Sequence, residues 1–228
     1  MPRVAVIVPV LDEHAALPTL LPALAALARE GAELAVVDGG SRDGTRAALA
    51  AAGLGPLDAP RGRATQMNAG AAATRAPILL FLHADTRLPD GALAAAADAI
   101  DRGAAGGCFR VRFDSRDPRL ALAAQIMSWR ARMLASASGD QALFVRRDLF
   151  EGLGGFRALP LMEDLDFTAR LRRVGRFVVA DGGAVTTSAR RWHTHGVMRT
   201  IALMWTLRLG YHLGVSPALL ARWYHDAR

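Results

Sequence analysis

Leu79-Leu80-Phe81-Leu82-His83-Ala84-Asp85-Thr86 passes from four apolar residues directly into a short polar cluster. The apolar run is short and follows Pro77, which is typical of a strand buried in a parallel sheet. The polar cluster then lies at the carboxyl end of that strand, the edge where open α/β sheets bind ligands. His83 and Asp85 could hold a hard cation there, and the cation a diphosphate. The alternative is a turn in which Asp85 caps a helix that begins near Pro89.

The residues before this stretch predict two further buried strands, each followed by a helix. Val4–Val8 and Glu33–Val37 are apolar runs, and 17–28 and 45–52 have apolar residues at helical spacing with a glycine after each. This alternation predicts a parallel sheet with right-handed crossovers. A chain of 228 residues is long enough for one large α/β domain with a full core.

The residues after it predict a less regular second half. Gly107–Phe113 alternates apolar and polar residues, so we expect a strand with one exposed face. Strands are further expected at 142–145, 176–180 and 184–187, helices at 120–135, 163–173 and 197–213, a short helix with a glycine turn at 150–156, and a polar loop at 188–196.

Composition indicates a globular protein that attracts anions. Hydrophobic residues make up 52% of the chain, the net charge is +7, and all 28 basic residues are Arg. Anionic substrates or an anionic membrane surface suit this charge, and nucleic acid is disfavoured because the Arg residues are scattered. Cys108 is the single cysteine, so no internal disulfide forms and a reducing compartment is compatible. We expect no signal peptide and no membrane span.

Two acidic segments are candidates for chemistry. Asp38 ends a strand beside Gly39 and Gly40, where its carboxylate could accept hydrogen bonds from a base or from ribose hydroxyls. We expect Asp43 to cap the next helix. Glu163 and Asp164 begin a helix, where the helix dipole alone favours acids. Because adjacent side chains point in different directions, one could cap the helix while the other takes a proton from a hydroxyl.

Basic and polar residues offer further candidates. Arg61 and Arg63 at a helix start suit a phosphate, although both could simply be solvated. Asn68 is expected to pack its helix or to contact a neighbouring loop. His193 and His195 could complete a metal or diphosphate site, or they could be ordinary loop residues. The helix at 197–213 lacks a clean polar face, so it could lie on a membrane or pack on a partner.

Taken in order, these motifs resemble those of glycosyltransferase family 2, the inverting nucleotide-sugar transferases with a GT-A fold, from Val4 to about Trp192. The segment 9–13 is similar to the family's opening P-x-x-N-E, and 37–45 to V-D-D-G-S-x-D-G-T, which lies on the nucleoside. His83-Ala84-Asp85 replaces the D-x-D metal motif, Glu163-Asp164 is similar to the E-D pair that supplies the general base, and 188–192 is a faint Q-x-x-R-W. More narrowly, the chain resembles a short bacterial branch labelled with arsenosugar biosynthesis.

The resemblance implies an α/β fold of the Rossmann-like GT-A type, with a mostly parallel central sheet flanked by helices and a smaller mixed-sheet acceptor half. Residues 1–196 would form this single domain, divided into a nucleotide-binding half (1–104) and an acceptor half (105–196). Residues 197–228 would form a helical extension.

The resemblance also implies which residues act. Asp164 would be the general base, beside Glu163, and Asp85 would hold Mn²⁺ or Mg²⁺. Because His83 replaces one carboxylate of the motif, His193 or His195 would assist. The residues expected to bind the nucleotide-diphosphate sugar are Pro9, Val10, Asp12, Glu13, Asp38, Arg63, Asn68, His83, Ala84, Asp85, Arg191 and Trp192.

The function implied is inverting transfer of a sugar from a nucleotide-diphosphate sugar to an acceptor hydroxyl, with no nucleic-acid partner. We expect a cytoplasmic enzyme, or one peripheral to the inner face of the membrane through 197–213. One alternative is a sugar-phosphate nucleotidyltransferase, but Leu11–His14 is not the glycine-rich loop that it requires. Another alternative is a non-catalytic module that binds a nucleotide sugar or a membrane surface. The intact Glu163-Asp164 pair argues against this alternative.

Overall fold

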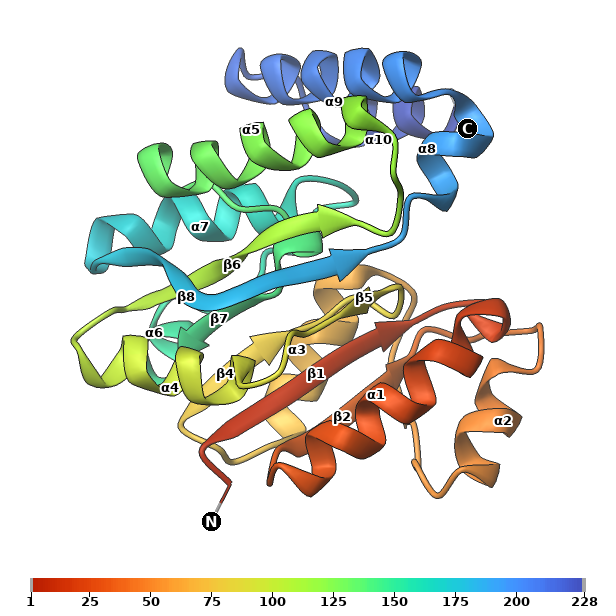
Figure 1. Ribbon diagram of the computed structural model, residues 1–228, viewed down its shortest axis with the longest axis vertical. Helices are drawn as coiled ribbons and strands as arrows, with labels where there is room; N and C mark the ends of the chain where they lie inside the picture. Colours follow the sequence, from red (N-terminus) through yellow and green to blue (C-terminus); the bar gives the residue numbers. More distant parts are fainter. Residues whose placement is uncertain (1, 227–228) are drawn as a thin grey trace.

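A single mixed sheet organises the computed structural model, which describes residues 2–226 (Figure 1). Its strand order among these residues is β3-β2-β1-β4-β7-β6-β8-β5. The strands are β1 (Val4–Val10), β2 (Glu33–Asp38), β3 (Leu57–Asp58), β4 (Ile78–Phe81), β5 (Thr86–Arg87), β6 (Gly106–Phe113), β7 (Leu143–Arg146) and β8 (Phe177–Thr187). The fold is therefore the α/β class with a mixed sheet that the sequence predicts.

Helices connect the strands and cover both faces of the sheet. They are α1 (Leu17–Arg29), α2 (Thr45–Ala51), α3 (Arg63–Ala73), α4 (Ala92–Asp101), α5 (Pro118–Leu134), α6 (Arg147–Gly152), α7 (Glu163–Val174), α8 (Arg190–His195), α9 (Val197–His212) and α10 (Pro217–Asp226), with short 3₁₀ turns η1 (His14–Ala16) and η2 (Gly139–Gln141). The predicted extension at 197–228 contains α9 and α10, and its last two residues lie outside the described part.

The first half forms the parallel part of the sheet. β1 lies between β2 and β4, parallel to both, and β3 pairs in parallel with β2. Side chains of β1 alternate between two hydrophobic cores: Val6 and Val8 pack on the side of α1 and α4, whereas Ile7 packs on the side of α3 and α7. Both faces of the strand are buried, so a continuous apolar run is what such a strand requires.

The second half adds the mixed part of the sheet. β7 runs antiparallel to β4 and to β6, and β8 pairs in parallel with β6. The two strands expected at 176–180 and 184–187 are in fact the single strand β8, whose register shifts opposite Cys108 and Arg110. Gly182 and Gly183 lie at the irregular part of this strand, where Gly183 adopts a left-handed φ of 94°.

The structure also excludes one alternative and corrects one expectation. The alternative role of Asp85 as a helix cap is excluded, because Asp85 leads directly into β5 and the next helix, α4, begins only at Ala92. The segment expected as a polar loop at 188–196 contains the short helix α8. α5 packs along β6, and α9 lies on the far side of α5 from the sheet (Figure 1). None of the helices in the described range is both long and apolar enough to cross a bilayer.

Candidate functional site

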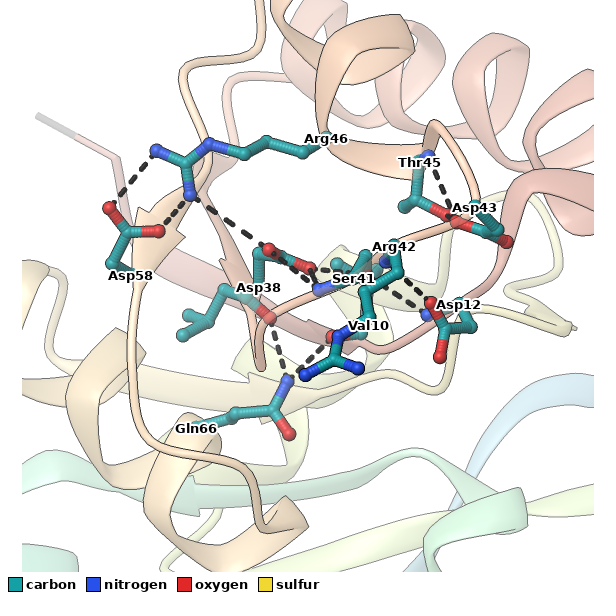
Figure 2. A network of polar contacts seen from close by, with 11 residues as sticks. Val10, Asp12, Asp38, Ser41, Arg42, Asp43, Thr45, Arg46, Asp58 and Gln66 are labelled. Carbon is teal, nitrogen blue, oxygen red and sulfur yellow. Dashed lines mark hydrogen bonds and ion pairs between the residues drawn. The ribbon is translucent and has the colours of Figure 1, made fainter.

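The carboxyl ends of β1 and β2 meet in a network of polar turns (Figure 2). Val10 lies opposite Asp38 in the register of the two strands. The amide of Gln66, from α3, donates to the carbonyl oxygens of Val10 (2.8 Å) and Val37 (2.9 Å), so it ties both strand ends to this helix. The loop after β1 is joined to the loop after β2 because the Arg42 N–H donates to Asp12 at 2.7 Å.

Asp38 is buried in this network. It is 1% exposed, and both of its carboxylate oxygens accept a hydrogen bond of 3.2 Å from the Ser41 N–H. Arg46 lies 3.8 Å away and also pairs with Asp58. Asp38 therefore closes the turn after β2 in this structure.

Gly39 occupies the position of the second acid in the family motif. A Cβ atom at Gly39 would lie 2.9 Å from the Gln66 side chain. Because that amide is already fixed by its two carbonyl partners, the turn has no room for an aspartate side chain. The departure from the motif therefore has a packing cause.

The ends of β1 and β4 bring two carboxylates near each other. Burial raises the pKa of Glu13, and the negative charge of Asp85 raises it further, while Arg190 and His83 oppose the shift. Asp85 lines a cavity of about 290 Å³ together with Arg190. Asp85 thus borders an open cavity just beyond the carboxyl end of β4.

His83 faces away from that pair, towards the loop before β7. Its Nδ1 lies 3.2 Å from a carboxylate oxygen of Asp140, and its ring lies against Gly139, where a Cβ atom would come within 2.2 Å of Nε2. Although burial opposes the shift, the hydrogen bond with His83 and the charges of Arg191 and Arg63 lower the pKa of Asp140 to about 2. Asp140 is therefore ionised at neutral pH.

Gly139 also connects this pair to the start of α7. Its N–H donates to Asp164 Oδ2 at 2.8 Å, and the Leu165 N–H donates to Asp164 Oδ1 at 2.7 Å. Glu163 is 3% exposed and accepts from Arg63 Nη1 at 3.2 Å. The two adjacent acids thus have separate environments: Glu163 is buried in an ion pair, and Asp164 faces a cavity.

Burial raises the pKa of Asp164 to about 6, and the neighbouring charge of Glu163 adds to the shift. The two N–H groups and Arg63 oppose it without cancelling it. Burial would by itself lower the pKa of Arg63, but Glu163, Asp164 and Asp140 raise it above its usual value. Asp164 therefore titrates close to neutral pH, which suits a group that must accept a proton.

The cavity that Asp164 faces is small. Its volume is about 80 Å³, and its lining includes His83, Asp140, Arg63 and Arg191. Leu207 of α9 and Tyr224 of α10 also line it, so the C-terminal helices cover it on one side. Ligand pockets usually measure about 300–1,000 Å³, so this cavity is the inner end of a site and not the whole of one.

Several predicted residues have structural contacts outside this cavity. Asn68 holds the segment before α7, since its amide donates to the Phe156 carbonyl oxygen and accepts from the Phe156 N–H. Trp192 packs edge-on against Phe113 at 5.0 Å. His193 lies 3.0 Å from Ser115 Oγ. Their assignments to the donor or the metal remain predictions.

Three residues at or beside the site were not predicted from the sequence: Asp140 and Arg208 line the cavity of Asp164, and the charge of Asp164 acts on the nearby Arg130. Asp140 comes from η2, Arg130 from α5 and Arg208 from α9. Gly139-Asp140-Gln141, a polar turn directly before a buried strand, was a visible signal, because ligand sites collect at strand ends. Nothing local distinguishes Arg130 or Arg208 from the other arginines.

The carboxylates at the strand ends could hold a divalent cation if the substrate supplies the remaining ligands. No three His, Cys, Asp or Glu side chains within residues 2–224 form a ready metal cluster. Mg²⁺ and similar ions are commonly held by one or two carboxylates, with substrate phosphates completing the coordination. Asp85 with Glu13 beside it is a donor set of that kind, and a cation would relieve the repulsion that raises the Glu13 pKa.

The sheet, with its parallel half and its mixed half, matches the GT-A fold of solved glycosyltransferases. The chain belongs to glycosyltransferase family 2, because the model of the family described as "Glycosyl transferase family 2" matches residues 5–157. It is therefore an enzyme, a glycosyltransferase. No curated protein sequence matches it significantly.

Solved glycosyltransferase structures share the fold. The mannosyltransferase PcManGT from Pyrobaculum calidifontis, in complex with GDP-Man and Mn²⁺, is 21% identical and has a TM-score of 0.71, over 99% of this chain and 70% of that one. S. aureus TarS 1–349 in complex with UDP is 21% identical with a TM-score of 0.66, over 89% of this chain and 65% of that one. The complex of the same fragment with UDP-GlcNAc has a TM-score of 0.63 at 20% identity, over 82% and 58%.

Proposed function

We propose that the enzyme transfers a sugar from a nucleotide-diphosphate sugar to an acceptor hydroxyl with inversion at the anomeric carbon, and that Asp164 is its general base. The observation that carries this proposal is the position of Asp164, whose carboxylate is held by two backbone N–H groups and faces a cavity at the edge of the sheet. The nucleotide sugars bound by PcManGT and TarS support the class of donor.

The donor would lie over the ends of β1, β2 and β4. Asp12 and Asp38 are fixed in the turns that would receive the nucleoside. An exchange of the Ser41 hydrogen bond for one from the nucleoside would free Asp38 to bind it. Arg63 and Arg191 line the cavity of Asp164 and carry the positive charge that a diphosphate requires.

Asp164 would act on the acceptor. At neutral pH its carboxylate is mostly ionised and remains basic enough to accept the hydroxyl proton as the oxygen attacks. Attack from the face opposite the leaving diphosphate gives inversion in one displacement, with no covalent enzyme intermediate. Glu163, buried against Arg63, would position the start of α7 and does not meet the substrate itself.

Asp85, with Glu13 close by, would hold Mn²⁺ or Mg²⁺, and the Mn²⁺ in PcManGT supports this. The bound ion would supply positive charge to the diphosphate as it leaves. His193 lies against Ser115, and to serve as a further ligand it would have to exchange that contact for the ion, as His195 would have to turn towards it. Peripheral contact of α9 with a membrane and a cytoplasmic location also remain proposals.

Donor binding tests the proposal directly. GDP-mannose and UDP-GlcNAc, each with and without Mn²⁺, are titrated while the melting temperature is followed. A donor at about 100 times its Kd should raise the melting temperature by roughly 5–10 °C. Asp85→Asn should abolish the part of the shift that depends on Mn²⁺, and Asp90→Asn, a surface acid five residues along, is the matched control.

A donor that binds is then used to measure turnover. Release of the nucleoside diphosphate shows whether the bond to the sugar is broken, and NMR of the product shows the configuration of the anomeric carbon. Retention of configuration would disprove the single-displacement mechanism. Binding without any release of nucleoside diphosphate, over a panel of acceptors, would favour the non-catalytic alternative.

A further inference from the structure

A groove of about 280 Å³ runs between α5 and α9, and it is lined mainly by apolar side chains. Leu122 and Ile126 of α5 form one wall, and Met198 and Trp205 of α9 form the other. Leu122, Met198 and Trp205 are 57%, 60% and 57% exposed. Side chains of this size, exposed together and flanking a depression, are typical of a binding surface.

The inner end of the groove is polar and reaches the candidate catalytic site. Arg130, Asp140, Arg191 and Arg208 lie there. Asp140, Arg191 and Arg208 also line the cavity that Asp164 faces. The groove therefore runs from an apolar outer part to the wall of the cavity that holds the proposed base.

Positive charge exceeds negative charge at this inner end. Three guanidinium groups lie near the carboxylates of Asp140 and of Asp164 in the adjoining cavity, and both carboxylates act on Arg130. No acid among the described side chains forms an ion pair with Arg130 or Arg208. The Nη2 atom of Arg130 is buried and has no hydrogen-bond partner among the atoms described. A buried cationic donor without a partner is costly, and an anionic group bound there would satisfy it.

We propose that this groove binds the acceptor, and that the acceptor is an amphiphile: its apolar chain lies between α5 and α9 and its anionic head group lies against Arg130 and Arg208. This assignment rests on the proposed function, because it takes Asp164 as the group that the acceptor must approach. It names the class of acceptor as one that carries the reacting hydroxyl, which must reach Asp164, beside an anionic head such as a phosphate on a hydrocarbon chain.

The shape of the site favours one inserted molecule over a flat membrane surface. A membrane could contact the exposed outer residues, but its surface would not reach the buried Arg130 Nη2 at the inner end. A single chain with a charged head reaches both. The apolar walls alone would suit any hydrophobic partner, and the arginines at the inner end select an anionic one.

Alkyl phosphates test this without a donor and without turnover. Hexyl, octyl and decyl phosphate, each below its micelle concentration, are titrated by calorimetry against the full chain, with decyl maltoside and decyltrimethylammonium as head-group controls. We expect the phosphates to bind, and affinity to rise about fourfold for each methylene that enters the groove. Decyltrimethylammonium should bind at least tenfold more weakly than decyl phosphate.

Two pairs of variants locate the site. Ile126→Asp should weaken decyl phosphate at least tenfold, whereas Met133→Asp, on the same helix and outside the groove, should not. Arg208→Gln should weaken decyl phosphate and leave decyl maltoside unchanged, and Arg199→Gln on the same helix should change neither. Circular dichroism confirms folding, and Trp205→Ala replaces Ile126→Asp if that variant does not fold.

The proposal fails if paired variants weaken binding equally, if affinity does not depend on chain length, or if the cationic amphiphile binds as well as the phosphate. Binding to vesicles of phosphatidylcholine with phosphatidylglycerol is measured as well, to distinguish a membrane surface from a single inserted amphiphile. Binding to vesicles without binding of monomeric decyl phosphate would overturn the groove and favour a surface contact. If the parent enzyme binds alkyl phosphates but does not turn over any nucleotide sugar, the proposed function is contradicted while the groove is still supported as a binding site.

Discussion

Asp164→Asn separates chemistry from binding more sharply than any other change in this enzyme. The substitution keeps the shape of the side chain and removes the group that would accept the proton. Its amide oxygen can still accept from either the Gly139 or the Leu165 N–H, although not from both. We expect kcat to fall by at least ~10²-fold, the usual contribution of a general base, while the affinity for the donor stays within about twofold.

The pH dependence follows from the raised pKa of Asp164. With a pKa of about 6, the carboxylate is mostly ionised at pH 7 and mostly protonated at pH 5. The parent enzyme should therefore lose kcat/KM about tenfold for each pH unit below 6. The Asn variant should lack this acidic limb, because nothing at position 164 titrates.

Stability gives an independent measure of the same group. Because the folded state raises the pKa of Asp164 from 3.8 to about 6, the folded parent binds this proton more tightly than the unfolded chain does. Its free energy of unfolding should therefore fall as the pH rises from about 4 to 6. The fall is at most ~3 kcal/mol, and about 1–2 kcal/mol is expected because Asp164 is partly exposed and interacts with Glu163. The Asn variant has no titrating group at this position, so its free energy of unfolding should not fall in this way. Measured by urea unfolding, its stability relative to the parent should therefore increase between pH 4 and 6.

Asp148→Asn is the control for both measurements, since Asp148 is an exposed acid on α6 that pairs with Arg146. Its kcat, its acidic limb and the fall in stability between pH 4 and 6 should match those of the parent. If Asp164→Asn retains more than a tenth of the parent kcat, or keeps the acidic limb, another residue is the base. Equal stability profiles for parent and Asn variant would show that the raised pKa of Asp164 is wrong.

Three further changes test the frame around the base. Gly139→Ala should lower kcat at least tenfold, because its Cβ would meet the His83 ring at 2.2 Å, whereas Gly152→Ala has open space and should be neutral in the same assay. Gln66→Leu leaves the Val10 and Val37 carbonyls unpaired and should cost about 1–3 kcal/mol in urea unfolding; an unchanged midpoint would refute the bridge. The lowered pKa of Asp140 adds stability above pH 4 that is lost as the pH falls through about 2. Asp140→Asn should therefore destabilise the protein by about 1 kcal/mol at pH 7 and by only a small part of that at pH 2.

The sequence predicts the parallel half well because burial and pattern agree there. Val6 and Ile7 face opposite cores, and a strand buried on both faces shows a continuous apolar run that a sequence displays directly. β8 was split in two because its irregular centre, at Gly182-Gly183, has the residues of a turn. Its pairing with β6, which holds the strand together across that irregularity, comes from a segment about seventy residues earlier and leaves no local sign.

The site was predicted where a motif lies at a strand or helix end, and missed where packing alone places a side chain. Asp85, Asp38 and Glu163 each belong to such an end. The separate environments of Glu163 and Asp164 could be expected because adjacent residues on a helix point in different directions. The sequence could not predict which of the two acids is buried, because that depends on the ion pair with Arg63, which lies one hundred residues away in the chain.

The three missed residues share one physical reason. Asp140, Arg130 and Arg208 acquire their surroundings only when η2, α5 and α9 pack together, and each stands in a segment with no distinguishing pattern. The helix at 197–213 looked unusual because its charged residues fall on no single face. In the structure, its Arg208 turns inward to the cavity of Asp164 while its Trp205 lines the groove beside α5. A helix that carries one wall of an apolar groove and one wall of a charged cavity needs both kinds of residue on neighbouring positions, so its lack of a clean polar face follows from where it lies.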